Sequence, residues 1–183
     1  GHSARAINAI KQLAANKRIK NIMSGSICTE EAAWENIKAG ATHLRVGVGP
    51  GAACSTRVMT GFGIPNAYAV KEIADAISDS RYGVQIIADG GISQPGQAMK
   101  YLLLGAHGVM LGHVLSQTEE SAGWIIPPVG TKHKSYRGQA SKAFQKEVLN
   151  KEYDCAEGVS LPNDFWDGQT TVASVIKKFE AGV

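Results

Sequence analysis

The sequence predicts an α/β fold built on a parallel β-sheet. Helical and strand patterns alternate four times between Ser3 and Leu111. The strand segments are short and largely apolar, as in sheets that are covered on both faces. A glycine stands at or near the carboxyl end of each strand, at Gly25, Gly47, Gly90 and Gly112. Such alternation requires right-handed crossovers between parallel strands, so the fold is either a doubly wound sheet or a barrel.

The helices are predicted from caps and from apolar periodicity. Ser3 can cap a first helix with apolar residues at helical spacing, and Thr29 followed by two glutamates begins a second, which stops at Gly40. The third and fourth helices are predicted because each falls between two strand patterns, and the fourth begins with a proline. In chain order the predicted elements are a helix after Ser3, a strand at Ile22–Met23 before a Gly25-Ser26 turn, a helix from Thr29 to Gly40, a strand at His43–Gly47, a helix over Ala69–Ile77, a strand at Val84–Ala88, a helix from Pro95 to Gly105 and a strand at Gly108–Leu111.

The pattern changes after Ala122. Residues of about 123–167 are polar and rich in turn formers, which predicts an excursion containing a hairpin and a flap. A last amphipathic helix is expected from Thr170 to Glu180. Four βα units cannot close an eight-stranded barrel without leaving two sheet edges open. Further chain must therefore complete a barrel of this kind.

Composition narrows the class of protein. The chain has 183 residues, 44% of them apolar and 19% charged, which is typical of one soluble domain. Its net charge of +3 is scattered, which favours a small anionic ligand and gives no sign of a nucleic-acid partner. Cys28, Cys54 and Cys155 are widely spaced, so neither a disulfide framework nor a zinc site is expected. No apolar stretch approaches the roughly 20 residues of a membrane span, and we expect a cytoplasmic protein.

The most informative segment surrounds Cys54. Three glycines, Gly47, Gly49 and Gly51, fall within five residues and allow the backbone to approach a ligand or ion closely. They place Cys54 on a polar loop after a strand, with Thr56 beside it. A lone cysteine is more often a small buried apolar residue, but this setting favours a nucleophile.

Four blocks together resemble the IMP dehydrogenase and GMP reductase family: Gly47–Thr56, Ile87–Ile92, Gly105–Gly112 and Tyr136–Ser141. The resemblance extends over essentially all 183 residues. It implies the C-terminal half of a (β/α)8 TIM barrel, holding strands five to eight, with a flap over about 123–167. An N-terminal half-barrel, from the same parent protein or a second chain, would supply the rest, and the family suggests a homo-tetramer.

The resemblance also implies site residues. Cys54, Thr56 and Glu157 would be catalytic. Substrate binding would involve Asp89 at the ribose, Gly90, Gly91, Gly112, His113 and Tyr136 around the 5′-phosphate, and Gly138, Gln139 and Ala140 along the purine. A nicotinamide cofactor would meet Gly25, Ser26, Gly47 and Glu120. Backbone carbonyls of Gly49, Gly51 and Cys54 would hold potassium. As alternatives, Asp89 is a helix cap or turn residue, His113 is a surface residue, and Glu120 begins a helix.

The direction of reaction depends on the flap. In both branches of this family a thiolate attacks C2 of the purine. The dehydrogenase then oxidises IMP with NAD and uses an Arg-Tyr pair on the flap to form XMP. The reductase instead uses NADPH and a Thr-Glu pair to convert GMP to IMP and ammonia. Residues 142–156 are few and hold no Arg-Tyr pair, although Arg137 has the dehydrogenase form. The sequence therefore favours GMP reductase, with IMP dehydrogenase as the alternative. Two other readings are a non-catalytic half of a split enzyme and a flavin-dependent barrel.

Overall fold

The chain folds into two compact units in the computed structural model, which describes residues 1–79, 81–122, 125–126, 133–150, 156–162 and 170–183. The first, the parallel-sheet unit, comprises Gly1–Pro50, Ile64–Asp89 and Ala98–Met110. The second, the antiparallel-sheet unit, comprises Gly51–Gly63, Gly90–Gln97 and Leu111–Val183.

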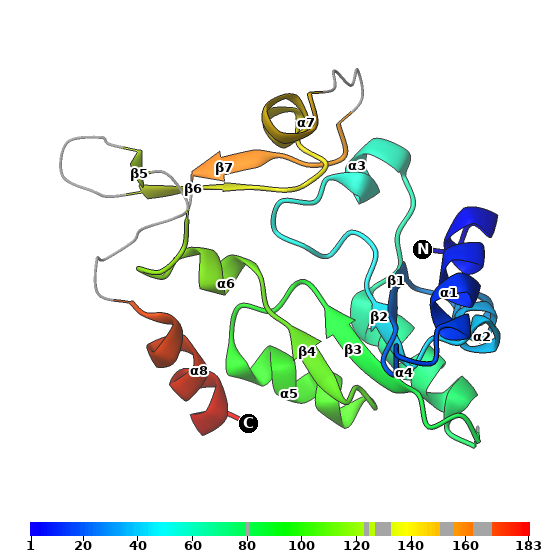
Figure 1. The fold of residues 1–183 in the computed structure, drawn as a ribbon. Coiled ribbons are helices and arrows are strands. Elements are labelled where there is room, and N and C mark those ends of the chain that lie inside the picture. The colour runs from blue at the N-terminus through cyan, green and yellow to red at the C-terminus, as the bar shows by residue number, and fades with distance from the viewer. Residues whose placement is uncertain (80, 123–124, 127–132, 151–155, 163–169) are drawn as a thin grey trace. The chain divides into compact units, whose positions relative to one another are not determined.

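Four parallel strands form the first unit, in the order β1-β2-β3-β4 (Figure 1). They are β1 (Met23–Ile27), β2 (His43–Val46), β3 (Gln85–Asp89) and β4 (Gly108–Met110). Adjacent strands in space are also consecutive in sequence, as right-handed βα units require. The prediction of an α/β fold with a parallel sheet is confirmed.

All four helices of this unit occur where the sequence predicts them, although the third begins at Asn66, before the predicted start at Ala69. They are α1 (Ala4–Ala15), α2 (Glu30–Ala39), α4 (Asn66–Ile77) and most of α5 (Pro95–Leu103). The hydroxyl of Ser3 accepts a hydrogen bond from the first turn of α1, and Thr29 does the same for α2. Gly40 ends α2 in the left-handed region. These polar caps satisfy N–H and C=O groups that a helix terminus would otherwise leave unpaired.

One face of the sheet is buried and the opposite face is only partly covered. Leu44 and Val46 on β2 and Ile86 and Ala88 on β3 are almost fully buried in a core shared with α2 and α4. The residues that alternate with them, including Arg45 and Asp89, keep intermediate exposure. Parallel sheets are normally covered on both faces. The face of this sheet that carries Arg45 and Asp89 is therefore more exposed than is usual for a parallel sheet.

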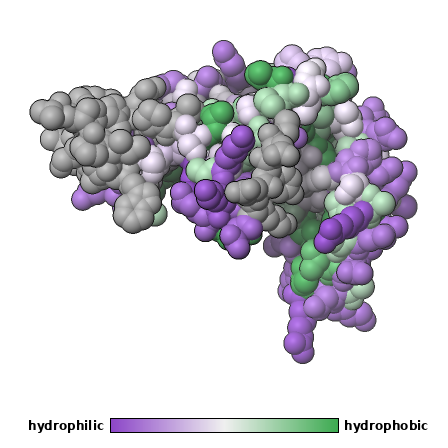
Figure 2. Space-filling model, turned by 90° about the horizontal axis from the view of Figure 1, so that it is seen from above, coloured by the Kyte–Doolittle hydropathy of each residue, from purple (hydrophilic) through white to green (hydrophobic). Residues whose placement is uncertain are grey.

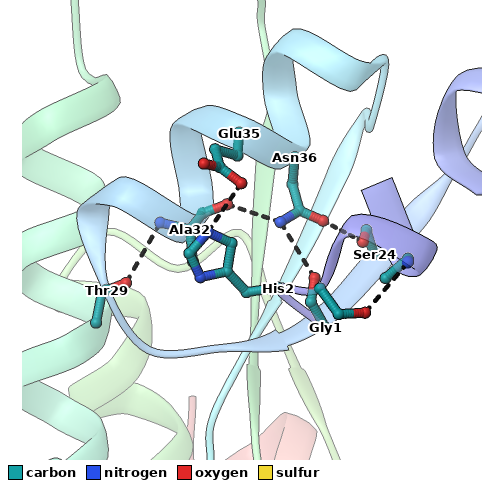
Figure 3. A network of polar contacts seen from close by, with 9 residues as sticks. Gly1, His2, Ser24, Thr29, Ala32, Glu35 and Asn36 are labelled. Carbon is teal, nitrogen blue, oxygen red and sulfur yellow. Dashed lines mark hydrogen bonds and ion pairs between the residues drawn. The ribbon is translucent and has the colours of Figure 1, made fainter. Parts of the chain in front are cut away.

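A polar network joins the N-terminal residues Gly1 and His2 to α2 and β1 (Figure 3). The Asn36 amide is fully buried and donates to the carbonyl of Ala32 at 2.7 Å and to that of Gly1 at 3.4 Å. Its oxygen accepts a hydrogen bond from Ser24. At the surface, His2 Nε2 lies 2.9 Å from Glu35 Oε2. Because every group of Asn36 is paired, its burial stabilises one arrangement of these elements.

The second unit holds a small antiparallel sheet, ordered β5-β6-β7, and several helices. Its strands are β5 (Ile125–Ile126), β6 (His133–Arg137) and β7 (Ser160–Pro162), and its helices are α3 (Thr56–Thr60), α6 (His113–Ser116), α7 (Lys142–Leu149) and α8 (Val172–Ala181). The antiparallel pairing of β5 with β6 agrees with the predicted hairpin, whose connecting residues 127–132 lie outside the described part of the chain. Parts of the expected flap, and Cys155, lie outside the described residues.

Some elements differ from the sequence prediction. Gly25 and Ser26 lie inside β1, with a register shift between Gly25 and Ile27, so the expected turn there is wrong. The apolar pattern misses this strand extension because glycine and serine carry no apolar signal. Helix α7 was not predicted; Ser141 caps it, but the segment is too polar to stand out.

The surface is mainly hydrophilic on the face seen in Figure 2. Among described residues, the most exposed large apolar side chains are Val58 and Phe62, at 85% and 80%. Both follow the Cys54 loop in sequence. None of the described helices is long and apolar enough to cross a membrane.

Candidate functional site

The loop that carries Cys54 is held by backbone pairing with residues far along the chain. The Ser55 N–H donates to the carbonyl of Glu157 at 2.9 Å, and the Val159 N–H donates to that of Ala53 at 3.0 Å. Cys54 and Gly158 form an antiparallel bridge between them. This pairing brings Glu157 to the cysteine loop across about a hundred residues of sequence.

Gly158 is required by the close packing of this bridge. A Cβ atom at this position would lie 2.9 Å from the backbone nitrogen of Ser141 and 3.3 Å from the carbonyl oxygen of Ala53. Both neighbours are backbone atoms, which cannot rotate away as a flexible side chain could. The glycine of the Glu-Gly pair is thus explained, because only a residue without a side chain permits this close approach.

Cys54, Thr56 and Glu157 form a short hydrogen-bonded series. The Cys54 thiol donates to Thr56 Oγ1 at 3.3 Å, and Thr56 Oγ1 donates to Glu157 Oε2 at 2.9 Å. Cys54 is exposed, as a nucleophile that must reach a ligand needs to be. A carboxylate thus lies two hydrogen bonds from the thiol, which fits the predicted roles of Cys54 as nucleophile and Glu157 as base.

The segment predicted to follow the purine lies against the same loop. The Gly138 N–H donates to the carbonyl of Val159 at 3.2 Å, and the Ser141 N–H returns to that of Gly138 at 3.0 Å. Gln139 is exposed and Ala140 is half-buried. The antiparallel-sheet unit therefore brings Gly138–Ser141 and the Cys54 loop together through shared contacts with residues 157–159.

The predicted phosphate residues Gly112, His113 and Tyr136 also cluster within this unit. Tyr136 Oη lies 3.7 Å from the point where a Cβ of Gly112 would stand. The rings of His113 and Tyr136 meet edge to face, with centroids 5.2 Å apart. Gly90 and Gly91, directly after β3, both have positive φ. A hydroxyl beside a glycine backbone offers the kind of donors that bind anions.

Asp89 lies in the parallel-sheet unit and has a partner that the sequence did not predict. Arg45 Nε is 3.4 Å from Asp89 Oδ2, and Arg45 Nη2 donates to Ser26 Oγ at 2.6 Å. Burial raises the pKa of Asp89, and the Arg45 guanidinium opposes that rise. The strand pattern could have predicted this pairing, because Arg45 alternates with the buried Leu44 and Val46 and so lies on the same face of the sheet as Asp89.

The remaining predicted cofactor residues have clear structural contacts. A Cβ on Gly25 would lie 2.5 Å from the carbonyl oxygen of Arg45, and one on Gly47 would lie 2.2 Å from that of Asp89, so neither position admits a side chain. The Glu120 carboxylate accepts from the Val172 N–H at 3.0 Å and so caps α8. Hydrogen bonds from the backbone N–H groups of Glu120 itself and of Val172 lower the pKa of Glu120. Contact between these residues and a nicotinamide cofactor stays a prediction.

The predicted potassium ligands are backbone carbonyls. That of Gly51 accepts a hydrogen bond from the Cys54 N–H at 3.0 Å, and Gly49 has a positive φ of 84°. In the part of the chain that the structure describes, no group of three His, Cys, Asp or Glu side chains could hold a metal ion. A monovalent ion bound by carbonyls remains a prediction.

Comparison with known proteins places the chain. Residues 1–182 match the IMP dehydrogenase / GMP reductase domain. Over 83% of its length the chain is 41% identical to an inosine-5′-monophosphate dehydrogenase of Aquifex aeolicus, and over its whole length 36% identical to one of Nitrosopumilus maritimus. The chain spans 31% and 40% of the length of these relatives. On this evidence the chain belongs to the IMP dehydrogenase and GMP reductase family.

Proposed function

We propose that this chain carries the nucleophile and phosphate-binding half of an IMP dehydrogenase, which converts IMP to XMP with NAD. The observation that carries the proposal is the hydrogen-bonded series Cys54–Thr56–Glu157 on the family's cysteine loop. The names of the relatives favour IMP over GMP as the substrate.

The chemistry requires two steps at purine C2. The Cys54 thiolate adds to C2 of IMP and a hydride leaves C2, which NAD accepts when bound. Water then attacks C2, the C–S bond breaks, and XMP leaves with the thiolate restored. Glu157, acting through the Thr56 hydroxyl, would take the proton of water in the second step and release it to solvent.

The sequence alone favoured GMP reduction over IMP oxidation, and the Thr56–Glu157 pair removes the reason for that preference. That preference rested on the absence of an Arg-Tyr pair from residues 142–156. A carboxylate joined to a hydroxyl can accept a proton from water or return one to a leaving amine, so the pair serves either reaction. GMP reductase, with NADPH, is the second candidate because residues 142–156 hold no Arg-Tyr pair.

The substrate contacts follow the predicted residues. Asp89 would accept the ribose hydroxyls, with Arg45 fixing its carboxylate. Amides of Gly91, Gly112 and His113, together with the Tyr136 hydroxyl, would donate to the 5′-phosphate. Gly90 would give the turn that exposes Gly91, and Gly138, Gln139 and Ala140 would pass along the purine.

Cofactor and ion contacts are part of the same proposal. Ser26, whose hydroxyl accepts from Arg45, would contact the nicotinamide cofactor together with Gly25, Gly47 and Glu120. Carbonyls of Gly49, Gly51 and Cys54 would hold potassium.

The chain would supply strands five to eight of a (β/α)8 barrel. Within the described sheet β1 and β4 each pair with one neighbour, which leaves two open edges, and the sheet face that bears Arg45 is partly exposed. An N-terminal half-barrel would cover both features. We call this chain joined to such a half-barrel the completed protein.

The test compares both reactions in the completed protein. NADH formation is followed with IMP and NAD, and NADPH loss with GMP. We expect faster IMP oxidation with release of XMP. Faster GMP reduction would support the second candidate, and flavin absorbance without either reaction would contradict both.

A further inference from the structure

Lys134 on β6 is a buried lysine whose ammonium group is held by backbone carbonyls. Only 3% of the residue is exposed. Its Nζ donates to the carbonyl oxygens of Thr118 at 2.6 Å, Glu119 at 2.7 Å and Ser121 at 2.9 Å. Three acceptors match in number the three N–H groups of an ammonium ion.

This arrangement has a physical consequence for the backbone around it. A buried charge without partners is strongly unfavourable, and carbonyl dipoles that point at it supply the missing solvation. The three carbonyls must then converge on one point, because any one that turns away leaves part of the charge unsolvated. Lys134 therefore fixes the path of residues 118–121.

The two segments that Lys134 joins both lead to the predicted phosphate residues. On the lysine side, Tyr136 stands two residues farther along β6. On the carbonyl side, residues 118–121 follow α6, which begins at His113 after Gly112. The buried Thr118 returns its hydroxyl to the carbonyl of Leu115 at 2.8 Å, so the loop is tied to α6 itself. The edge-to-face contact of His113 with Tyr136 joins α6 directly to β6.

We propose that Lys134 is a positioning residue for the nucleotide 5′-phosphate: its ammonium group holds the loop after α6 against β6, and thereby sets the Tyr136 hydroxyl beside the amides of Gly112 and His113. Lys134 does not itself touch the phosphate. The inference rests on the proposed function, since it needs a phosphate bound at these residues.

The same loop also anchors α8, so a purely structural role must be separated from a positioning role. The Glu119 N–H donates to the carbonyl of Thr170 at 2.8 Å, and Glu120 caps Val172. Loss of α8 docking would lower stability without distinguishing a ligand that carries a phosphate from one that lacks it. Comparison of IMP with inosine, which differ only by the phosphate, makes that distinction.

The experiment measures the dissociation constants of IMP and inosine for the completed protein and three variants. Lys134→Ala removes the ammonium group and the methylene groups beyond Cβ. Lys134→Arg keeps the charge, and Lys177→Ala removes an exposed lysine on α8 as the matched control. We expect Lys134→Ala to weaken IMP binding by about tenfold or more, the effect of losing charge-assisted contacts, and inosine binding by less than about twofold. Lys177→Ala should change neither.

Chemical rescue keeps the test decisive where Lys134→Ala is unstable. n-Propylammonium replaces the atoms that the substitution removes, whereas propan-1-ol has similar size and no charge. Recovery of IMP affinity with the amine and not with the alcohol supports the proposal, as does partial retention in Lys134→Arg. Equal losses for IMP and inosine, unchanged IMP binding in Lys134→Ala, or no rescue by the amine overturns it. Failure of the unsubstituted protein to bind either IMP or inosine would instead contradict the proposed function.

Discussion

The two units of the molecule are stabilised by different kinds of contact. In the parallel-sheet unit, apolar side chains such as Leu44 and Ile73 are fully buried between strands and helices. In the antiparallel-sheet unit, the cysteine loop is held by backbone hydrogen bonds to residues 157–159, and the loop after α6 by a buried ammonium group. Most buried side chains of the parallel-sheet unit are apolar, although Asn36 is also fully buried. In the antiparallel-sheet unit, hydrogen bonds hold the backbone while Cys54 and Glu157 stay exposed.

The two kinds of contact predict that substitutions in the two units affect different properties, stability in one and turnover in the other. Changes in the core of the parallel-sheet unit should lower stability with little effect on chemistry, because the core side chains are not among the predicted site residues. Changes at the cysteine loop should lower turnover with little effect on stability, because Cys54 and Glu157 are exposed.

The largest effect is expected from Cys54→Ala in the completed protein. Turnover of IMP should fall below about one per cent, because no covalent adduct can form, while IMP binding should stay within about tenfold. Steady-state assays and calorimetric titration measure the two quantities. Cys28→Ala is the control, since Cys28 packs against the core of the other unit and should leave turnover intact. Retained turnover in Cys54→Ala would refute the nucleophile.

Glu157→Gln should have the next largest effect. The amide cannot accept a proton from Thr56, and loss of a positioned base costs about 10²–10⁴-fold in rate. Release of XMP should slow by that factor while the free energy of unfolding stays unchanged. Rapid-quench analysis separates hydride transfer from product release; a variant with normal XMP release would remove Glu157 from the mechanism.

Leu44→Ala tests whether the apolar core of the parallel-sheet unit supplies its stability. Removal of a fully buried leucine side chain should lower the free energy of unfolding by about 2–5 kcal/mol through lost burial and a residual cavity. The matched control is Leu103→Ala, because Leu103 is 78% exposed on α5. Urea denaturation measures both. A similar loss in the two variants would mean that this core is not the source of stability.

The smallest effects concern two carboxyl groups whose pKa values move in opposite directions. Burial raises the pKa of Asp89 above its ordinary 3.8, so stability should fall as pH rises from about 3.8 through the raised pKa. Hydrogen bonds lower the pKa of Glu120 below its ordinary 4.5, so its contribution should be lost as pH falls below about 4.5. Asp89→Asn should remove the first dependence and Glu120→Gln the second, in urea unfolding at a series of pH values. Unchanged pH profiles would contradict these environments.

The sequence predicted the parallel-sheet unit well because its elements depend on local signals. Apolar spacing and the caps at Ser3 and Thr29 lie within a few residues of the helices they predict. The strand at Gly25-Ser26 was missed, since those residues carry no such signal. For the site, the family resemblance named Thr56 and Glu157, but their hydrogen bond joins residues 101 apart, which local spacing cannot predict. The roles of Arg45 and Lys134 were missed because each depends on partners in other elements.

The central claim is that Cys54 forms a covalent adduct at purine C2, with Glu157 as the base for its hydrolysis. The direct measurement is mass spectrometry of the completed protein quenched during turnover with IMP and NAD, followed by proteolysis to locate the modification. We predict a nucleotide adduct on the peptide that contains Cys54, at higher occupancy in Glu157→Gln than in the unsubstituted protein. NADH production with no adduct on Cys54, or an adduct on Cys28 alone, would contradict the account.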